Sequence, residues 1–377
     1  MIGRRLILAW CLIAAGGHAM AAMDRAPVPA DRPADLPARI VPSAGDLIGE
    51  AGLSGTVGFL LADARTGAVL EARGSESRFP PASTVKALTA LYAIDSLGRG
   101  FRYRTRLVAT GPVREGRIQG DLILRGGGDP TLSTDDLAGL AGDLAKAGVI
   151  GVTGRLLYDD AALPGVPQID ASQPAHVAYN PAIGGLNLNF NRVHFQWRRD
   201  GGDWALRMDA PAGAYRPEVG VARMQVVERS GPVYTYASKG GRDEWTVAST
   251  ALGNGGSRWL PVRRPGLYSG EVFRALAGDA GIALPAPEEG RIPAGGGAVL
   301  ADHASAPLED ILRGALKYST NLTAEVAGLS SSTARARAPL SSVKGSGARM
   351  ARWARSRLDV DGLSLVDHSG LGAASRV

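Results

Sequence analysis

A serine and a lysine three residues apart could act as a nucleophile and its base. Ser83 and Lys86 lie in the segment PPASTVKALTALYA, residues 80–93. Residues three apart on a helix share a face, so the hydroxyl and the amine could come within hydrogen-bond distance. Burial disfavours the charged form of lysine, and a neutral amine can accept the proton of a serine hydroxyl. A Ser-x-x-Lys pattern also arises by chance, in which case Ser83 only caps a helix and Lys86 is a surface lysine.

A second polar group, Ser319-Thr320-Asn321, lies in the segment LKYSTNLTAE between two stretches of helical periodicity. Catalytic side chains are often displayed on such connections, although Ser and Asn are equally typical of a turn or a helix cap. Ser-x-x-Lys at the start of a helix, combined with Ser-x-Asn on a later connection, is the signature of serine enzymes that recognise penicillin. The pair of motifs is far more specific than either motif alone.

The elements that would position these residues follow from the periodicity of apolar residues. Residues 55–74 form two apolar runs about a turn that contains Gly, which predicts a β-hairpin. From Ser83 to Gly98 the apolar residues recur at helical spacing. Short alternating runs between about 102 and 262 predict mostly strands, with one helix near 134–147. Helical periodicity returns from Tyr268 onward.

This order of elements predicts an α/β (α+β) chain in which one domain is interrupted by a β-rich insertion. We assign residues 43–101 and 263–377 to the split catalytic domain and residues 102–262 to the insertion. At 377 residues the chain exceeds what one hydrophobic core usually organises, which agrees with more than one packed unit.

The first residues have the pattern of an export signal. Arg4 and Arg5 precede an apolar run and the small-x-small pattern Ala19-Met20-Ala21, so residues 1–21 are predicted to be a cleavable signal peptide. Residues 22–42 are rich in Pro, Ala and Asp without periodicity and predict a flexible lead-in. We therefore expect the protein to act in the periplasm.

Composition argues against several other classes of function. The formal net charge of +6 is mild for this length, and the arginines near residue 104 alternate with other residues, as on the solvated face of a strand. A nucleic-acid partner is therefore not expected. The histidines are scattered without metal-site spacing, and Cys11, the only cysteine, lies within the predicted signal peptide. No metal, cofactor or disulfide is expected.

Beyond the two motifs, the sequence resembles the class C low-molecular-mass penicillin-binding proteins, the D-alanyl-D-alanine carboxypeptidases and endopeptidases of the bacterial periplasm. The similarity runs from about Ala44 to the last residue. It is carried by the segments DARTGAVLEARGSESRFPPASTVKALTALYAI, LRGGGDPTLS, GRLLYDDAALPG, YNPAIGGLNLNFNRVHF and GLSLVDHSGLG. The resemblance implies a penicillin-binding transpeptidase or β-lactamase-like domain with a large β-rich insertion.

The resemblance also implies a role for individual residues. Ser83 would attack the carbonyl of the penultimate D-alanine, and Lys86 would take its proton. Ser319 would relay a proton toward the leaving D-alanine, and Asn321 would hold the substrate amide and the lysine. Asp159, in LLYDD, is the best match to an acidic residue that the insertion places near the cleft to bind substrate. The implied partners are peptidoglycan stem peptides ending in D-Ala-D-Ala, with β-lactam antibiotics as inhibitors.

The sequence departs from the family pattern in three places. The third motif, Lys-Thr-Gly, does not occur: the only lysine after Asn321 is Lys344, in SVKGSG, and the chain as given stops at SGLGAASRV, before the point where that motif would come. The chain is therefore expected to be truncated there. The missing strand would supply an oxyanion donor, the loss of which costs about 10²–10³ in kcat. In addition, His368 replaces a Gly, and Gly372-Ala373 replace the usual Ser-Arg.

Two alternatives stay open beside the peptidase. A serine β-lactamase shares both motifs, but such enzymes generally lack a long segment between them. A catalytically impaired wall-binding fragment would keep the scaffold and turn over nothing for want of the third motif. The run VDHSG, residues 366–370, aligns Asp, His and Ser, but consecutive residues do not converge as a catalytic triad does.

Overall fold

The computed structural model describes residues 42–336, 340 and 342–377, which divide into two compact units at the junction of Ser77 and Arg78. The predicted signal peptide (1–21) and all but the last residue of the predicted lead-in (22–42) lie outside the described residues. Over the part of the chain that is described, no helix has the length and apolar character needed to span a bilayer.

The first unit contains the predicted hairpin. Its elements are α1 (Ala44–Glu50), β1 (Phe59–Ala62) and β2 (Val69–Arg73). The two strands pair antiparallel, and Gly67 in the turn between them has a φ of 73°, which glycine adopts readily. A capping box between Ser43 and Asp46 starts α1, and the backbone N–H of Ala44 donates to the Glu71 carboxylate of β2.

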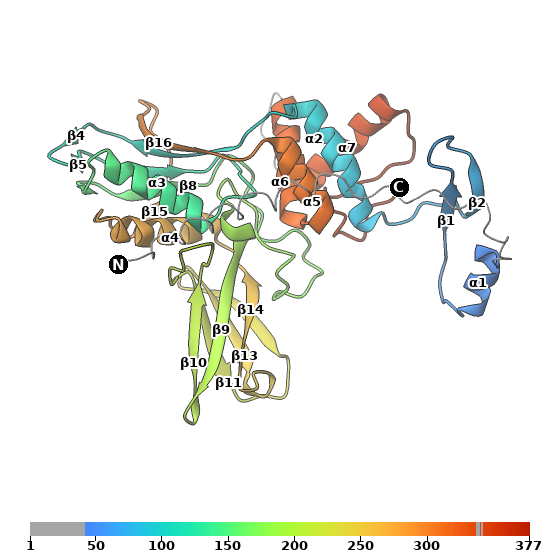
Figure 1. Cartoon of the computed structure of the whole chain (residues 1–377), viewed down its shortest axis with the longest axis horizontal. Coiled ribbons are helices and arrows are strands. Elements are labelled where there is room, and N and C mark those ends of the chain that lie inside the picture. The colour runs from blue at the N-terminus through green and yellow to red at the C-terminus, as the bar shows by residue number, and fades with distance from the viewer. Residues whose placement is uncertain (1–41, 337–339, 341) are drawn as a thin grey trace, which may run out of the picture. The chain divides into compact units, whose positions relative to one another are not determined.

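Four helices of the second unit pack side by side and carry the two sequence motifs (Figure 1). They are α2 (Val85–Leu97), which follows the short 3-10 helix η1 (Ala82–Thr84), α5 (Leu308–Tyr318), α6 (Asn321–Arg335) and α7 (Val343–Leu358). Ala93 of α2, Leu312 of α5 and Val326 of α6 are buried in one apolar cluster. The helix that begins just after Ser83 is thereby held against the two helices that flank Ser319.

The segment between α2 and α5 is mostly β-structure, as the sequence predicts. One sheet has the strand order β15-β8-β6-β3-β16, and three smaller sheets have the orders β4-β5-β7, β10-β9-β14 and β11-β13-β12. The helices α3 (Thr134–Lys146) and α4 (Pro265–Asp279) share a continuous core with these sheets. The strands are β3 (Arg104–Ala109), β4 (Val113–Arg114), β5 (Arg117–Ile118), β6 (Leu122–Arg125), β7 (Gly151–Val152), β8 (Leu156–Asp159), β9 (Arg192–Asp200), β10 (Asp203–Asp209), β11 (Ala222–Val227), β12 (Tyr234–Lys239), β13 (Arg242–Ala248), β14 (Gly255–Pro261), β15 (Pro287–Glu289) and β16 (Ala298–Ala304), with short 3-10 helices η2 (Leu188–Asn191) and η3 (Ser249–Ala251).

The packing continues past the predicted end of the insertion at residue 262. Strand β16 pairs antiparallel with β3, β15 pairs with β8, and α4 packs against α3 and β8. Residues 263–304 therefore belong by packing to the β-rich part of the unit rather than to the helices around α2. The periodicity of α4 predicts a helix but does not show which elements that helix packs against.

Candidate active site

The predicted contact between the serine and the lysine is present. Ser83 is exposed within η1, whereas Lys86, in the first turn of α2, is only 3% exposed. The Lys86 Nζ donates a hydrogen bond of 2.9 Å to the Ser83 Oγ. An accessible hydroxyl thus contacts an amine that is shielded from water.

The backbone around Ser83 is held in an uncommon conformation by the C-terminal segment. Ala82 has a φ of 46°, which few residues other than glycine adopt. Gly370, with a φ of 74°, lies directly against it: a Cβ at position 370 would come 1.8 Å from the Ala82 carbonyl oxygen. Only glycine allows this approach, so the segment around Gly370 supports the strained turn that presents Ser83.

Helix α2 is also hydrogen-bonded to this segment through two side chains. The Lys86 Nζ donates to the Ser369 carbonyl over 2.8 Å, and the Thr89 Oγ1 donates to the His368 carbonyl over 2.7 Å. The amine of Lys86 is therefore placed between its predicted reaction partner and a backbone carbonyl.

Burial shifts the protonation equilibrium of Lys86 toward the neutral amine. Desolvation lowers the pKa of Lys86, while the charges of Glu325 and Asp367 oppose this and raise it. The pKa nevertheless stays below its ordinary value. A lysine with a lowered pKa is neutral in a larger fraction of molecules near neutral pH and can act as a base.

Two buried carboxylates behind Lys86 were not singled out from the sequence. Glu325 of α6 is fully buried, and burial, followed by the nearby Asp367, raises its pKa to about 8. Burial also raises the pKa of Asp367, which is 2% exposed. A signal for Glu325 existed, because it interrupts the otherwise apolar and small face of LTAEVAGL. Asp367 carried no local signal beyond its place in the family-like segment.

The structure places the Ser-x-Asn motif at the junction of α5 and α6. Ser319 is exposed and ends α5 with a φ of 54°, and Asn321 starts α6. The Asn321 Nδ2 donates to the Tyr179 carbonyl over 3.0 Å. Among the described residues neither side chain is hydrogen-bonded to Ser83 or Lys86. The predicted roles of Ser319 and Asn321 toward substrate stay predictions.

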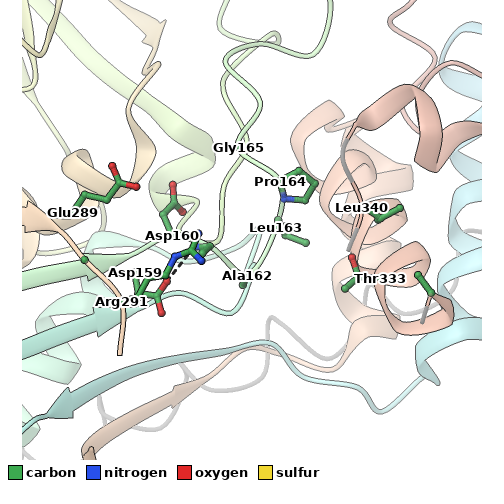
Figure 2. Close-up of a pocket in the computed structure, with 13 residues that line it drawn as sticks. Asp159, Asp160, Ala162, Leu163, Pro164, Gly165, Glu289, Arg291, Thr333 and Leu340 are labelled. Atoms are coloured by element: carbon green, nitrogen blue, oxygen red, sulfur yellow. Dashed lines mark hydrogen bonds between the residues drawn. The ribbon is translucent and has the colours of Figure 1, made fainter. Parts of the chain in front are cut away.

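Asp159 lies in a different place, at the end of β8. Its Oδ2 is 3.7 Å from the Arg125 Nε, and its Oδ1 accepts from the Ala161 N–H. Asp159 lines a cavity of about 640 Å³, with Asp160 and Arg291 on the same side and Thr333 and Leu340 opposite (Figure 2). The predicted catalytic residues Ser83, Lys86, Ser319 and Asn321 do not line this cavity. Asp159 as a substrate-binding residue stays a prediction.

Comparison with known proteins places this geometry in a family. The model of the D-Ala-D-Ala carboxypeptidase 3 (S13) family matches residues 47–377. The chain belongs to this family. It is 30% identical over 300 residues to a D-alanyl-D-alanine carboxypeptidase of Actinomadura sp. (strain R39), which covers 73% of this chain and 54% of the relative. The chain thus spans about half the length of that relative.

Further matches agree with the family. Over 103 residues the chain is 31% identical to the D-alanyl-D-alanine carboxypeptidase DacB of Haemophilus influenzae, covering 27% of this chain and 22% of the relative. The crystal structure of penicillin-binding protein 4 from the same organism, complexed with a β-lactam, superposes with a TM-score of 0.70 at 19% identity. That match covers 89% of this chain and 75% of the other. The predicted transpeptidase-like α+β fold is confirmed.

His368 occupies a position where the resemblance described in the sequence analysis implies a glycine. Its ring is fully buried, and its Nε2 lies 2.7 Å from the Ser346 Oγ of α7. Gly328 of α6 makes the room: a Cβ there would be 2.1 Å from the His368 Cγ. The histidine side chain thus fills a space that a helix glycine leaves open.

The run Asp367-His368-Ser369 is not a triad, as the sequence predicts. The two carboxylate oxygens of Asp367 accept from the backbone N–H groups of Gly370 and Gly372. The His368 ring faces Ser346 instead. No cluster of potential metal ligands occurs within the described residues.

His368 should make the protein less stable in acid. Burial lowers the pKa of His368 from 6.5 to about 3, so between these values the unfolded state binds a proton that the native state excludes. Stability then falls as the pH decreases through this window, by about 2 kcal/mol at pH 5. The measurement is urea unfolding from pH 4.5 to 7.5 for the wild type and His368→Gln. The variant should lose this acid-side decline; a decline of equal slope in both proteins would contradict the assignment.

Proposed function

We propose that this chain carries the acylation site of a serine-type D-alanyl-D-alanine carboxypeptidase or endopeptidase that acts on peptidoglycan stem peptides. The observation that carries the proposal is the 2.9 Å contact between the exposed Ser83 hydroxyl and the buried Lys86 amine. A serine hydroxyl is a weak nucleophile on its own, and an adjacent base with a lowered pKa is what activates it.

In the proposed reaction the Ser83 Oγ attacks the carbonyl carbon of the penultimate D-alanine while its proton passes to the Lys86 Nζ. The amide C–N bond then breaks, and the leaving D-alanine amine takes up the proton from the Lys86 Nζ through Ser319 as the proposed relay, which leaves Lys86 neutral again. Water attacks the resulting ester and gives its proton to Lys86, so that Ser83 is restored by the reverse path. Cleavage of a cross-link between two stem peptides is the same chemistry with a different leaving amine.

Several findings support this proposal. The relatives are named as D-alanyl-D-alanine carboxypeptidases, and one solved structure of similar fold is described as complexed with a β-lactam. The long β-rich segment between the two motifs argues against a β-lactamase. We further propose that residues 1–21 direct export to the periplasm, where the substrate lies, and that β-lactam antibiotics inhibit the protein. Asn321 and Asp159 are proposed to contact the substrate.

The test is acylation by a fluorescent penicillin. Labelling should be stable, and trypsin digestion should place the adduct on the peptide from Phe79 to Lys86. Ser83→Ala should abolish labelling, whereas the control Ser77→Ala, which removes an exposed hydroxyl six residues earlier in the sequence, should be labelled like the wild type. Release of D-alanine from a synthetic peptide ending in D-Ala-D-Ala should depend on Ser83 in the same way.

The other outcomes identify the alternatives. Fast loss of the label with hydrolysis of the antibiotic would indicate a β-lactamase. A folded protein that takes up no label and releases no D-alanine would contradict an enzymatic role and favour the wall-binding fragment.

A further inference from the structure

We propose that Glu325 is a positioning residue for Lys86 and acts on it through the backbone of His368 and Ser369 and through its own charge. Its link to Lys86 is read directly from the structure, and only its effect on acylation rests on the function proposed above.

The geometric link is a short series of contacts. The Glu325 Oε1 accepts from the backbone N–H of Ser369 over 2.8 Å and from that of His368 over 3.1 Å. The carbonyl of the same Ser369 accepts from the Lys86 Nζ, which in turn donates to the Ser83 Oγ. The carboxylate of Glu325 therefore holds the backbone N–H of Ser369, and the carbonyl of that same residue accepts from the proposed base. No contact between Glu325 and Ser83 is needed.

Burying the side chain of Glu325 has a cost in free energy. An ionised carboxylate in a fully buried position carries a large desolvation penalty unless a nearby group compensates it. Here the compensation comes from two backbone N–H groups and from the cation of Lys86 when that amine is protonated. Burial raises the pKa of Glu325 to about 8, so its charge is present near and above that pH, whereas its two backbone hydrogen bonds can form in either protonation state.

The charged groups that affect the pKa of Lys86 come from two elements. The groups that act on Lys86 are Glu325 from α6 and Asp367 from the C-terminal segment. Asp367 is in turn affected by Lys86 and by Asp170 of the loop before η2. His368 has its pKa lowered to about 3 by burial and is neutral. Glu325 follows Asn321 by four residues on α6, so the two residues share a face of that helix.

Two substitutions separate the charge of Glu325 from its hydrogen bonds. Glu325→Gln keeps an oxygen at the Oε1 position and removes the charge. Glu325→Asp keeps the charge but withdraws the carboxylate by one methylene. The matched control is Glu271→Gln, because the Glu271 carboxylate of α4 accepts from two consecutive backbone N–H groups in the same way, those of Gly220 and Val221.

The first measurement does not depend on activity. The titration of Lys86 is followed by side-chain NMR of ¹³C- and ¹⁵N-labelled protein, in which Lys146, Lys239, Lys317 and Lys344 are the other lysines. The pKa of Lys86 should lie below the ordinary value of a lysine. In Glu325→Gln its midpoint should move to still lower pH, because a charge that raises its pKa is gone. Glu271→Gln should leave the midpoint unchanged.

The second measurement is the rate of penicillin acylation against pH. In Glu325→Gln the rise of the rate with pH should begin at lower pH, by the same shift as the NMR midpoint. Glu325→Asp should lower the rate by about 10² at every pH, because misplacing a catalytic group by about 1 Å has an effect of that size.

The outcomes distinguish this inference from the proposed function. If Glu325→Gln leaves the Lys86 midpoint where it is in the wild type and in Glu271→Gln, the inference is wrong, even if Glu325→Asp does not fold. If the midpoint moves but the wild type is never acylated, the link between Glu325 and Lys86 stands and the proposed function falls. If the wild type is acylated and both Glu325 variants match it in acylation rate and pH profile, the inference about Glu325 is wrong and the proposed function still holds.

Discussion

Replacing Lys86 with methionine is expected to lower the rate constant for acylation of Ser83 by about 10²–10⁴, the usual contribution of a positioned general base. Methionine keeps an apolar side chain of similar length in this buried site but cannot accept a proton. The hydroxyl of Ser83 then has no base within hydrogen-bond distance among the described residues. Stopped-flow measurement of fluorescent penicillin binding gives the rate constant directly.

The pH dependence of the residual rate adds a second criterion. In the wild type the rate should rise with pH as the Lys86 amine loses its proton, and this rise should disappear in Lys86→Met. Lys146→Met is the control, because Lys146 is an exposed residue of α3 whose amine pairs with Asp143. Acylation of Lys86→Met at the wild-type rate would show that another group serves as the base.

Gly328→Ala is expected to destabilise the protein by about 3 kcal/mol, at the upper end of the range for overpacked cores. The added methyl group would be 2.1 Å from the Cγ of His368, a ring that is fully buried and contacts Ser346. The free energy of unfolding in urea measures the effect.

A double-mutant cycle tests the cause. In the His368→Gly background the ring is absent, so Gly328→Ala should cost little or even stabilise α6, and the coupling should be at least about 2 kcal/mol. Gly314→Ala on α5 is the matched control, because no atom lies within 4 Å of a Cβ there. It should stabilise the helix by about 0.5–1 kcal/mol. Equal effects of Gly328→Ala with and without the ring would refute the packing explanation.

The sequence alone predicted the features that depend on local spacing. The hairpin of β1 and β2 followed from two apolar runs about a turn, and α2 from apolar residues at helical spacing that end before Gly98. The contact of Ser83 with Lys86 followed from the same helical geometry, since three residues span less than one turn. Local patterns of this kind are retained in the folded protein. Tertiary packing does not change which residues share a face of a helix or pair across a hairpin.

The sequence could not determine which distant groups surround the lysine. Glu325, Asp367 and the Ser369 carbonyl meet Lys86 only because α2, α6 and the C-terminal segment pack together, and no local pattern encodes that packing. The same is true of Gly328 beneath His368, and of Asp159, which lines a cavity apart from Ser83. The sequence therefore predicted the contact between the proposed nucleophile and its proposed base, through the geometry of one helix turn. The tertiary structure decided how that base is charged and held, because burial and electrostatic fields arise only from residues brought together across the whole fold.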